Sequence, residues 1–321
     1  MEIGGLAPSA PLLFAAILLD AICGDPDVPL HPVRLLGRFL ATCEKHLRNV
    51  GADGYLGGCA LFAILAAIAA GIPSVLVSVA YALSPVVGYV GHVLLVYVCL
   101  AFRDLIDHVR RVEQAAAGEN LAAARSAIGN LVGRDTDRMN LAACRRAAIE
   151  SLAENFVDGF LSVVFWYLLL GLPGMLLFKV ASTMDSMVGY RTPRYVRFGW
   201  CGARLDDLMN YVPARIAWLI LGLAALPFRD LSAVCGWKAG LRYHGVLPSP
   251  NSGWSEATLA GILRRRLVGP IWVQGSLVTD TWIGDLSDPE GGAPGDIQRA
   301  FRAAIAAAAI VSLFSVALGL A

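Results

Sequence analysis

The sequence predicts an all-α, polytopic integral membrane protein. Hydrophobic residues make up 57% of its 321 residues and charged residues only 16%, whereas about a quarter of a typical soluble domain is charged. Several long stretches contain no Asp, Glu, Lys or Arg at all. Because a bilayer core about 30 Å thick requires about 20 apolar residues in a helix, these stretches indicate membrane helices.

The uncharged stretches give the order of these helices along the chain. Residues 3–23 are expected to form a retained span, because the N-terminus lacks the basic segment of a signal peptide. Residues 54–102 are long enough for two spans, and Ser84-Pro85 is the natural turn between them. Residues 303–321 form the last apolar run.

Arginines in the connecting segments predict the orientation. Segments 24–53 and 103–158 flank the hairpin, so they lie on one side of the membrane, and their arginines make that side cytoplasmic. A full crossing by 159–178 would place the next Arg-rich segment outside. Gly171-Leu-Pro-Gly174 interrupts this run, and 216–228 is too short for a span. We therefore predict that 159–178 and 216–228 are broken or re-entrant helices.

Two polar regions are expected on the cytoplasmic side. In the segment about 103–158, apolar residues follow helical spacing beneath a charged face: Leu105, Val109, Val112 and Ala116. Gly118 should interrupt this amphipathic helix, while Asn120 and Asn140 should cap the next two helices. Residues about 229–302 are expected to form a second cytoplasmic loop. The whole chain, 1–321, is predicted to be a single membrane domain.

Composition and motifs exclude several classes of protein. The net charge is +1 and no basic stripe is interleaved with aromatic residues, so nucleic acid is not an expected partner. Seven scattered cysteines without a C-x-x-C pair exclude a disulfide framework and a typical zinc site. The sequence after Gly133 is Arg-Asp-Thr and not the Gly-Lys-Thr of a P-loop, so any nucleotide must bind in another way.

Three acids are spaced to lie on one helical face just before an apolar run. Glu150, Glu154 and Asp158 stand at i, i+4 and i+8. Like charges at this spacing destabilise a helix, so an arginine, a divalent cation or protonation should neutralise them. One interpretation is an exposed acidic face paired with Arg145 or Arg146. The other is a Mg²⁺ ion held through these carboxylates and substrate phosphates.

A second group of polar residues follows the next apolar run. An ionisable group at membrane depth is costly and therefore suggests a functional site, which favours a role for Asp185. The alternative is an ordinary interfacial aspartate. Arg204, Asp206 and Asp207 would equally suit a structural salt-bridge cluster, and a lone histidine such as His31 is more often structural than catalytic.

Five clusters together resemble the CbiB/CobD family of cobalamin-biosynthesis proteins, the adenosylcobinamide-phosphate synthases. They run in order from residue 19 to about 256: Leu19-Asp20-x4-Asp25-Pro with His31-Pro-Val-Arg34; Val132-Gly-Arg-Asp135-Thr; Glu150-Ser-x-Ala-Glu154-Asn155-x-x-Asp158-Gly; Asp185-Ser-Met-Val-Gly-Tyr190-Arg191 with Arg204-Leu-Asp206-Asp207; and Ser249-Pro-Asn251-Ser-Gly253-Trp254-x-Glu256. The chain departs from the pattern at His244, which lies farther from Ser249 than the family leads us to expect, so no role is assigned to it.

The resemblance implies a ligase that acts late in cobalamin assembly. The expected reaction joins adenosylcobyric acid to (R)-1-aminopropan-2-ol O-phosphate, or to aminopropanol itself, and gives adenosylcobinamide phosphate. ATP and Mg²⁺ are the expected cofactors. The lipid bilayer is an expected partner, other cobalamin-assembly enzymes are candidate partners, and the active site should face the cytoplasm at the inner (cytoplasmic) membrane.

The resemblance also implies roles for residues of this chain. The candidate catalytic residues are Glu154, Asp158, Asp185 and His31, and the candidate Mg²⁺ ligands are Glu150, Glu154, Asp158 and Asp185. Substrate or ATP binding is expected of Asp25, Arg34, Arg134, Asp135, Asn155, Arg191, Arg204, Asp206, Asp207 and Asn251. The arginines suit phosphate or carboxylate clamps, and the asparagines could hydrogen-bond amide side chains of a corrin ring.

Two other classes of function fit parts of the sequence. A membrane transporter of a corrinoid or a phosphorylated small molecule also uses broken helices and polar residues at membrane depth, although no pseudo-symmetric halves are detectable. A non-catalytic scaffold for neighbouring enzymes would tolerate changes at Asp185 and Arg204.

Overall fold

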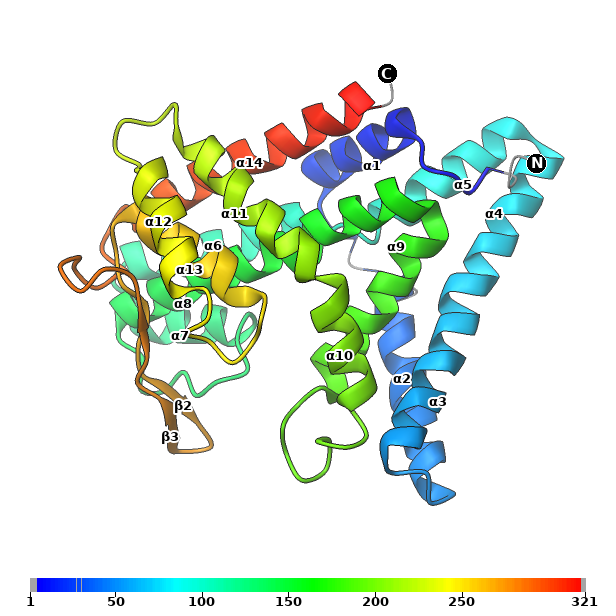
Figure 1. The fold of residues 1–321 in the computed structure, drawn as a ribbon, viewed down its shortest axis with the longest axis horizontal. Helices are drawn as coiled ribbons and strands as arrows, with labels where there is room; N and C mark the ends of the chain where they lie inside the picture. Colours follow the sequence, from blue (N-terminus) through cyan, green and yellow to red (C-terminus); the bar gives the residue numbers. More distant parts are fainter. Residues whose placement is uncertain (1–4, 27, 30, 319–321) are drawn as a thin grey trace. The chain divides into compact units, whose positions relative to one another are not determined.

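A computed structural model describes residues 5–26, 28–29 and 31–318. Most of these residues lie in helices, so the predicted all-α membrane class is confirmed. The strands are four short segments that form two antiparallel two-stranded sheets, β1–β4 and β2–β3. Figure 1 shows how few of the described residues they occupy.

The chain divides into two compact units. Unit 1 comprises Met1–Ala101, Asp158–Asn210 and Phe314–Ala321, and unit 2 comprises Phe102–Val157 and Tyr211–Leu313. The single membrane domain over 1–321 stays a prediction, because two compact units can belong to one domain.

Unit 1 consists of helices, including a π-helical turn (η1). Its elements are α1 (Ala10–Cys23), α2 (Pro32–Asn49), α3 (Tyr55–Ala66), η1 (Ala67–Gly71), α4 (Ile72–Leu83), α5 (Pro85–Tyr97), α9 (Ser162–Val188) and α10 (Trp200–Met209). A second π-helical turn, η2 (Val157–Leu161), contains the boundary between the units and leads into α9.

The predicted hairpin over 54–102 is confirmed. The segment Tyr55–Leu83 is one apolar helical stretch, the chain turns at Ser84, and α5 begins with Pro85. The π-helical turn η1 lies just before Pro73, which cannot donate a backbone hydrogen bond and therefore favours such an irregular turn.

The predicted membrane segment at the N-terminus differs in length from the expectation. The helix at the N-terminus, α1, has 14 residues and is about 21 Å long, shorter than the span expected over 3–23; residues 3 and 4 lie outside the described residues. Pro8 precedes this helix. Pro11 fits the first turn, because backbone N–H groups there have no acceptor within the helix and proline has no N–H.

The predicted break in the run 159–178 is confirmed. Gly171, inside α9, has φ 67° and ψ −157°, a conformation that interrupts the helix and that glycine adopts without strain. The next residue, Leu172, donates its backbone N–H to the Leu6 carbonyl at 3.1 Å.

Unit 2 combines helices with the short strands. Its elements are α6 (Phe102–Ala117), α7 (Leu121–Gly129), α8 (Leu141–Phe156), α11 (Tyr211–Ala225), α12 (Ala233–Tyr243), α13 (Ser252–Leu263), β1 (Leu267–Val268), β2 (Ile271–Val273), β3 (Ser276–Thr279), β4 (Trp282–Ile283) and the larger part of α14 (Asp296–Leu318).

The helices predicted in 103–158 form as their local signals indicate. The apolar stripe of α6 is buried, and Gly118 follows the end of this helix. The Asn120 side chain accepts a hydrogen bond from the Ala123 N–H at 3.0 Å, and Asn140 accepts one from the Ala143 N–H at 2.8 Å. Both predicted caps are therefore confirmed.

The segment 229–302 is more ordered than a loop. It contains α12, α13 and all four strands. Strands of two to four residues leave too little alternation for a sequence pattern to show. The signal that was available is Gln274-Gly275, whose positive φ angles of 50° and 78° form the tight turn between β2 and β3.

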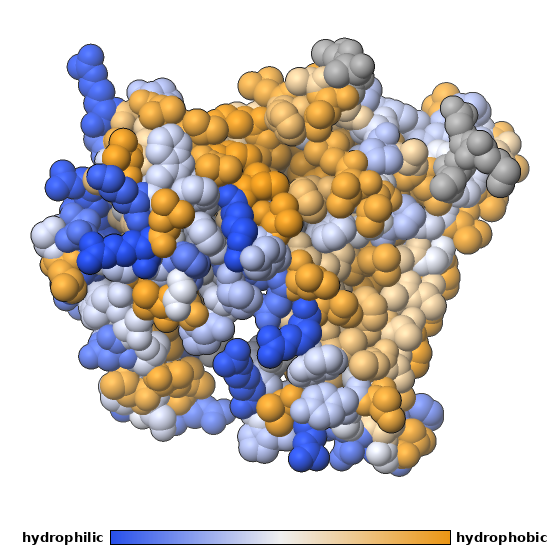
Figure 2. All heavy atoms as spheres, in the orientation of Figure 1, coloured by the Kyte–Doolittle hydropathy of each residue, from blue (hydrophilic) through white to orange (hydrophobic). Residues whose placement is uncertain are grey.

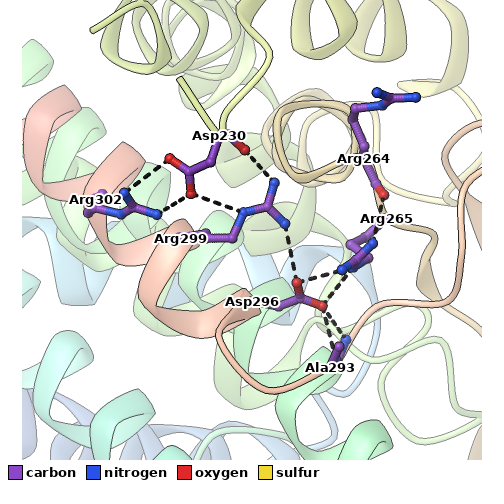
Figure 3. A network of polar contacts seen from close by, with 8 residues as sticks. Asp230, Arg264, Arg265, Ala293, Asp296, Arg299 and Arg302 are labelled. Carbon is purple, nitrogen blue, oxygen red and sulfur yellow. Dashed lines mark hydrogen bonds and ion pairs between the residues drawn. The ribbon is translucent and has the colours of Figure 1, made fainter. Parts of the chain in front are cut away.

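An ion-pair network holds the start of α14 in place (Figure 3). Asp296 is 1% exposed and accepts hydrogen bonds from Arg265 Nε at 2.9 Å and from the backbone N–H of Ala293 at 3.0 Å. Arg299 donates to Asp296, and Arg302 pairs with Asp230 in the segment between α11 and α12. The helix therefore begins at Asp296, seven residues before the predicted apolar run.

Four helical stretches among the described residues are long and apolar enough to cross a membrane, or five if the bent pair α10–α11 forms one span. Hydrophobic residues dominate the visible surface of α3 and α4, as a lipid-facing surface requires, whereas hydrophilic residues gather around α12 (Figure 2). The protein is therefore a multi-pass membrane protein.

Candidate functional site

A group of acids in unit 2, here called the carboxylate cluster, consists of Glu150 and Glu154 on α8 and Glu256 on α13. Arg134 NH2 donates to Glu150 Oε2 at 2.6 Å, and both side chains are about nine-tenths buried, at 10% and 9% exposure. The other oxygen of Glu150, Oε1, accepts the backbone N–H of Val268 at 3.0 Å. Each carboxylate oxygen of Glu150 therefore accepts a hydrogen bond, and the two bonds together fix the orientation of the carboxylate.

Glu256 is buried and lies close enough to the other two acids for their charges to act on it. Burial raises the pKa of this carboxyl well above its usual range, and the negative charges of Glu154 and Glu150 raise it further, while Arg134 opposes the shift. A carboxyl with a raised pKa holds its proton at a higher pH than an ordinary glutamate does. The cluster therefore has the properties of an acid–base site.

The two arginines considered as partners of the acidic face have other roles. Arg145 Nε donates to Glu113 Oε2 at 2.8 Å. Arg146 Nε donates to the Val268 carbonyl at 2.8 Å, although the charge of Arg146 still acts on Glu150. For Glu150, the expected direct pairing with Arg145 or Arg146 is therefore wrong. Arg134, which lies on the connecting segment between α7 and α8, makes the pair with Glu150.

Asp135, the neighbour of Arg134, holds the β2–β3 hairpin. Its Oδ1 and Oδ2 accept the backbone N–H groups of Gln274 at 3.0 Å and Gly275 at 2.7 Å. Its own backbone N–H donates to the Trp272 carbonyl at 2.8 Å. The motif Gly133-Arg134-Asp135 therefore anchors two distant segments, the acid on α8 and a hairpin turn.

The remaining predicted residues of unit 2 make local contacts. Asn155 donates to the Ser151 carbonyl, one turn earlier on α8, at 2.9 Å. Asn251 is buried at the start of α13, and Arg215 NH1 lies 3.5 Å from its Oδ1. His244 stacks on Trp254 of α13, with ring centroids 4.0 Å apart.

A second charged group, here called the lysine cluster, lies in unit 1. It consists of Lys179 on α9 and three acids whose charges interact with it: Asp158, Asp25 and Asp20. Asp20 is 2% exposed, and Asp25 Oδ1 lies 2.9 Å from Nε2 of the buried His31. Lys179 also lines a cavity of about 300 Å³ whose other walls are mostly apolar, among them Phe39 and Leu176.

The Asp185 region of unit 1 also contains more than one acid. Asp185 is half-buried near the end of α9, and the like charge of Asp207 acts on it. Arg204 NH1 lies 3.7 Å from Asp207 Oδ2, and the charge of Arg191 also acts on Asp207. Arg191 and Arg204 are exposed, so they can reach a charged ligand.

Asp206 and Arg34 complete the predicted set. Asp206 Oδ2 accepts from Asn210 at 3.0 Å, and Asn210 Oδ1 accepts from Ser162 Oγ at 2.6 Å. Since Asn210 is 2% exposed, this chain of bonds fixes α10 against the start of α9. Arg34 is exposed on the first turn of α2.

The predicted site residues thus gather in separate groups. Glu150, Glu154 and Arg134 come together in unit 2, Asp25 and His31 with Asp158 in unit 1, and Asp185 with Asp207. Asp158 lies in the π-helical turn η2, where the regular spacing that defined the three-acid face has ended. Across the described chain, no group of three or more His, Cys, Asp or Glu side chains is arranged to hold a metal ion.

Sequence reasoning missed two residues that complete these groups. Glu256 belongs to the Trp254-x-Glu256 motif, but its proximity to Glu150 depends on the packing of α13 against α8. Lys179 was the better signal, because it is a lysine directly after the uncharged run 159–178. A charge at that position requires a partner.

Comparison with known protein families identifies the family. The family described as CobD/Cbib protein matches residues 13–304. The chain belongs to this family.

Curated relatives extend the match to nearly the full chain. A protein of Sinorhizobium sp named cobalamin biosynthesis protein CobD is 39% identical over 281 residues, which cover 85% of this chain and 86% of the relative. The CobD of Pelobacter propionicus is 37% identical over 314 residues, 98% and 97% of the two chains. The cobalamin biosynthesis protein CbiB of Salmonella typhi is 36% identical over 293 residues, 89% and 90% of the two chains. No solved structure matches this chain.

Proposed function

We propose that this protein forms an amide bond in cobalamin biosynthesis, joining adenosylcobyric acid to (R)-1-aminopropan-2-ol O-phosphate, or to aminopropanol, with consumption of ATP. The role in cobalamin biosynthesis follows from membership of the CobD/Cbib family and from relatives with that name. The observation that supports an enzymatic reaction is the carboxylate cluster, in which three acids adjoin a buried arginine.

The proposed chemistry needs an activated carboxyl group, because a carboxylate is a poor electrophile. The corrinoid carboxylate would accept the γ-phosphoryl group of ATP, and ADP would leave. The amine would then attack the resulting acyl phosphate, lose a proton and displace inorganic phosphate. Such phosphoryl transfer depends mainly on positioning and on neutralisation of phosphate charge.

The residues of unit 2 suit parts of this chemistry. Arg134 presents N–H donors beside Glu150 and can bind a phosphate oxygen. Glu256, with its raised pKa, or the exposed Glu154 can accept the proton of the attacking amine. The exposed arginines of unit 1, Arg191 and Arg204, are candidate clamps for the phosphate of the amine substrate.

Mg²⁺ fits the donor chemistry of the carboxylate cluster. A magnesium ion prefers oxygen ligands and is usually bound through one or two carboxylates together with substrate phosphates. Because no group of three acids in the described residues forms a metal site by itself, phosphates would have to supply further ligands. When bound through Glu150 or Glu154, the ion would neutralise phosphate charge.

The protein is a multi-pass membrane protein, and we propose that its active site faces the cytoplasm. The support is the arginine content of segments 24–53 and 103–158, which the positive-inside rule assigns to that side. ATP is available there.

The test is a direct assay of the purified protein in nanodiscs. The mixture contains adenosylcobyric acid, aminopropanol phosphate, Mg²⁺ and ATP; mass spectrometry follows the corrinoid while a second assay follows ADP. The expected result is a corrinoid heavier by the condensed amine, with ADP formed in equal amount. An unchanged corrinoid mass, with both substrates shown to bind, would contradict the proposal. Accumulation of intact corrinoid in proteoliposomes would then favour transport.

Residue roles are tested in the same assay. Glu154→Gln and Glu256→Gln should each lower turnover by about a hundredfold or more, because a general acid or base contributes at least about this factor. Lys45→Met, at an exposed position on α2, is the control and should keep wild-type turnover. Turnover that survives both glutamine substitutions would remove the carboxylate cluster from the active site.

A further inference from the structure

Unit 2 contains a pocket with two tryptophans and two arginines in its walls. Its volume is about 320 Å³, and its lining includes Trp272, Trp282, Arg138 and Arg146. The Arg138 guanidinium lies 4.0 Å from the Trp272 ring centroid, and the Arg146 guanidinium lies 4.6 Å from the Trp282 ring centroid. The volume is at the lower end of the range for small-molecule sites.

The wall formed by Trp282 and Arg146 is held by backbone contacts. Arg146 is 8% exposed and donates its Nε to the Val268 carbonyl at 2.8 Å. Trp282 pairs with Val268 in the β1–β4 ladder. Both side chains of this wall are therefore positioned by the same residue of β1.

The part of the wall formed by Trp272 depends on Asp135. The Asp135 carboxylate accepts the two N–H groups of the Gln274-Gly275 turn, and the Asp135 backbone donates to the Trp272 carbonyl. Since both carboxylate oxygens are occupied in this way, Asp135 acts as a positioning residue for the hairpin. The sequence motif that singled out Asp135 thereby contributes to the shape of the pocket.

The pocket adjoins the carboxylate cluster through one residue. Val268 accepts from Arg146 through its carbonyl and donates to Glu150 through its N–H at 3.0 Å. On the other side of Glu150 stands Arg134, at 2.6 Å. A ligand with a planar ring in the pocket and anionic groups toward Arg134 would therefore contact two connected parts of unit 2.

The chemistry of the lining selects among the ligands of the proposed reaction. Tryptophan faces suit a planar aromatic ring, and guanidinium groups suit an anion. Because the exposed Arg138 guanidinium lies over Trp272, a ring must stack on the other face of Trp272 or displace this side chain. Both acids of the lining have partners outside it: the Asp135 oxygens accept backbone N–H groups, and Glu290 Oε1 lies 3.5 Å from Arg266 NH2. A corrin ring is too large for about 320 Å³, and aminopropanol phosphate has no ring. A nucleotide base remains.

We propose that this pocket binds the purine base of ATP by stacking on Trp272, with the phosphates directed toward Arg134 and the carboxylate cluster. The inference rests on the proposed function, since ATP is the nucleotide of that reaction. It adds a base-binding site that contains no P-loop.

The test measures nucleotide binding separately from catalysis. MgATP binding to the wild-type protein in nanodiscs is followed by equilibrium dialysis, and inorganic tripolyphosphate is used as a competitor without a base. Trp272→Ala should weaken MgATP binding about tenfold, because stacking of one base on an aromatic residue contributes on this scale. The affinity for tripolyphosphate should change less than about twofold. Trp272→Phe keeps an aromatic face and should restore most of the MgATP affinity.

Trp200→Ala, at an exposed position in unit 1, is the matched control and should bind MgATP as the wild type does. Thermal melting of each variant verifies that it is folded. If Trp272→Ala does not fold, the test uses Trp272→Phe and Arg138→Ala instead. Arg138→Ala removes the exposed guanidinium over the Trp272 ring.

Three outcomes would contradict the proposal that this pocket binds the base of ATP. These are wild-type MgATP affinity in folded Trp272→Ala, equal loss of MgATP and tripolyphosphate affinity, or absence of MgATP binding by the wild type. In the first two cases continued formation of the amide product would leave the proposed function intact. In the third case, absence of product as well would show that the proposed function has failed.

Discussion

The carboxylate cluster of unit 2 and the lysine cluster of unit 1 both contain three acids, but different cations neutralise them. Glu150 accepts directional hydrogen bonds from a guanidinium and from a backbone N–H. Asp20, Asp25 and Asp158 instead interact with the charge of an ammonium group, Lys179, and Asp25 Oδ1 also lies 2.9 Å from His31 Nε2. A guanidinium has a fixed fork of donors, whereas an ammonium is a compact point charge. The first cluster should therefore depend more on geometry and the second more on charge.

The largest effect is expected at Arg134. Arg134→Ala leaves Glu150 buried without its ion pair, which should lower the free energy of unfolding by about 3–5 kcal/mol. Arg134→Lys should recover little, because an ammonium does not reproduce the guanidinium geometry. The measurement is denaturant unfolding in mixed micelles, with Arg111→Ala, at an exposed position on α6, as the control. Full recovery by lysine would show that this cluster, too, responds only to charge.

The next effect is expected at Lys179. Lys179→Met removes the cation that the three acids share, and we expect a loss of about 1–3 kcal/mol. Lys179→Arg should retain most of the stability, since the charge is kept. The same unfolding measurement, with Lys45→Met as the control, tests this. If Lys179→Arg is as unstable as Lys179→Met, the contrast between the clusters is lost.

A pH dependence should distinguish the carboxylate cluster further. Because the pKa of Glu256 is raised in the folded protein, the folded state binds this proton more tightly than the unfolded state does. Its contribution to stability is present below the unfolded value of about 4.3 and is lost as pH rises through the folded pKa. The melting temperature should therefore fall over that interval, and Glu256→Gln should flatten the fall. An unchanged slope in Glu256→Gln would assign the pH dependence to other groups.

The smallest effect is expected at the cap of α8, the helix that carries Glu150 and Glu154. Asn140→Ala removes the acceptor of the Ala143 N–H and should cost about 1 kcal/mol. Asn140→Asp keeps an acceptor and should restore the stability. The melting temperatures of the two variants give the comparison. A loss of several kcal/mol in the free energy of unfolding would mean that Asn140 also supports the pocket that it lines.

Features that depend on neighbouring residues could be predicted from the sequence. The apolar runs, the turn at Ser84-Pro85 and the break at Gly171 follow from the local propensities of glycine and proline. The caps Asn120 and Asn140 follow from side chains that bond three residues ahead. Each of these predictions depends on a window of a few residues, and the structure confirms each.

Features that depend on distant residues could not be predicted in this way. The bond between Glu150 and the Val268 N–H joins positions 118 residues apart, and no local pattern specifies such a separation. Arg134 pairs with Glu150 because of the path of the segment between α7 and α8, although Arg145 and Arg146 are nearer to Glu150 in sequence. The π-helical turn η2 likewise ended the regular spacing on which the three-acid face depended.

The division of unit 2 into two stretches of chain has a consequence for biosynthesis. Glu150 and Arg134 lie in its first stretch, whereas Val268 and the Asp296 network lie in its second, after an intervening part of unit 1. During translation the acids of α8 are made well before the backbone that binds them. The nascent chain must therefore keep these carboxylates in contact with water or a chaperone until almost the whole protein has left the ribosome. A chain truncated before β1 would lack these backbone contacts and should be recognised by membrane quality-control proteases.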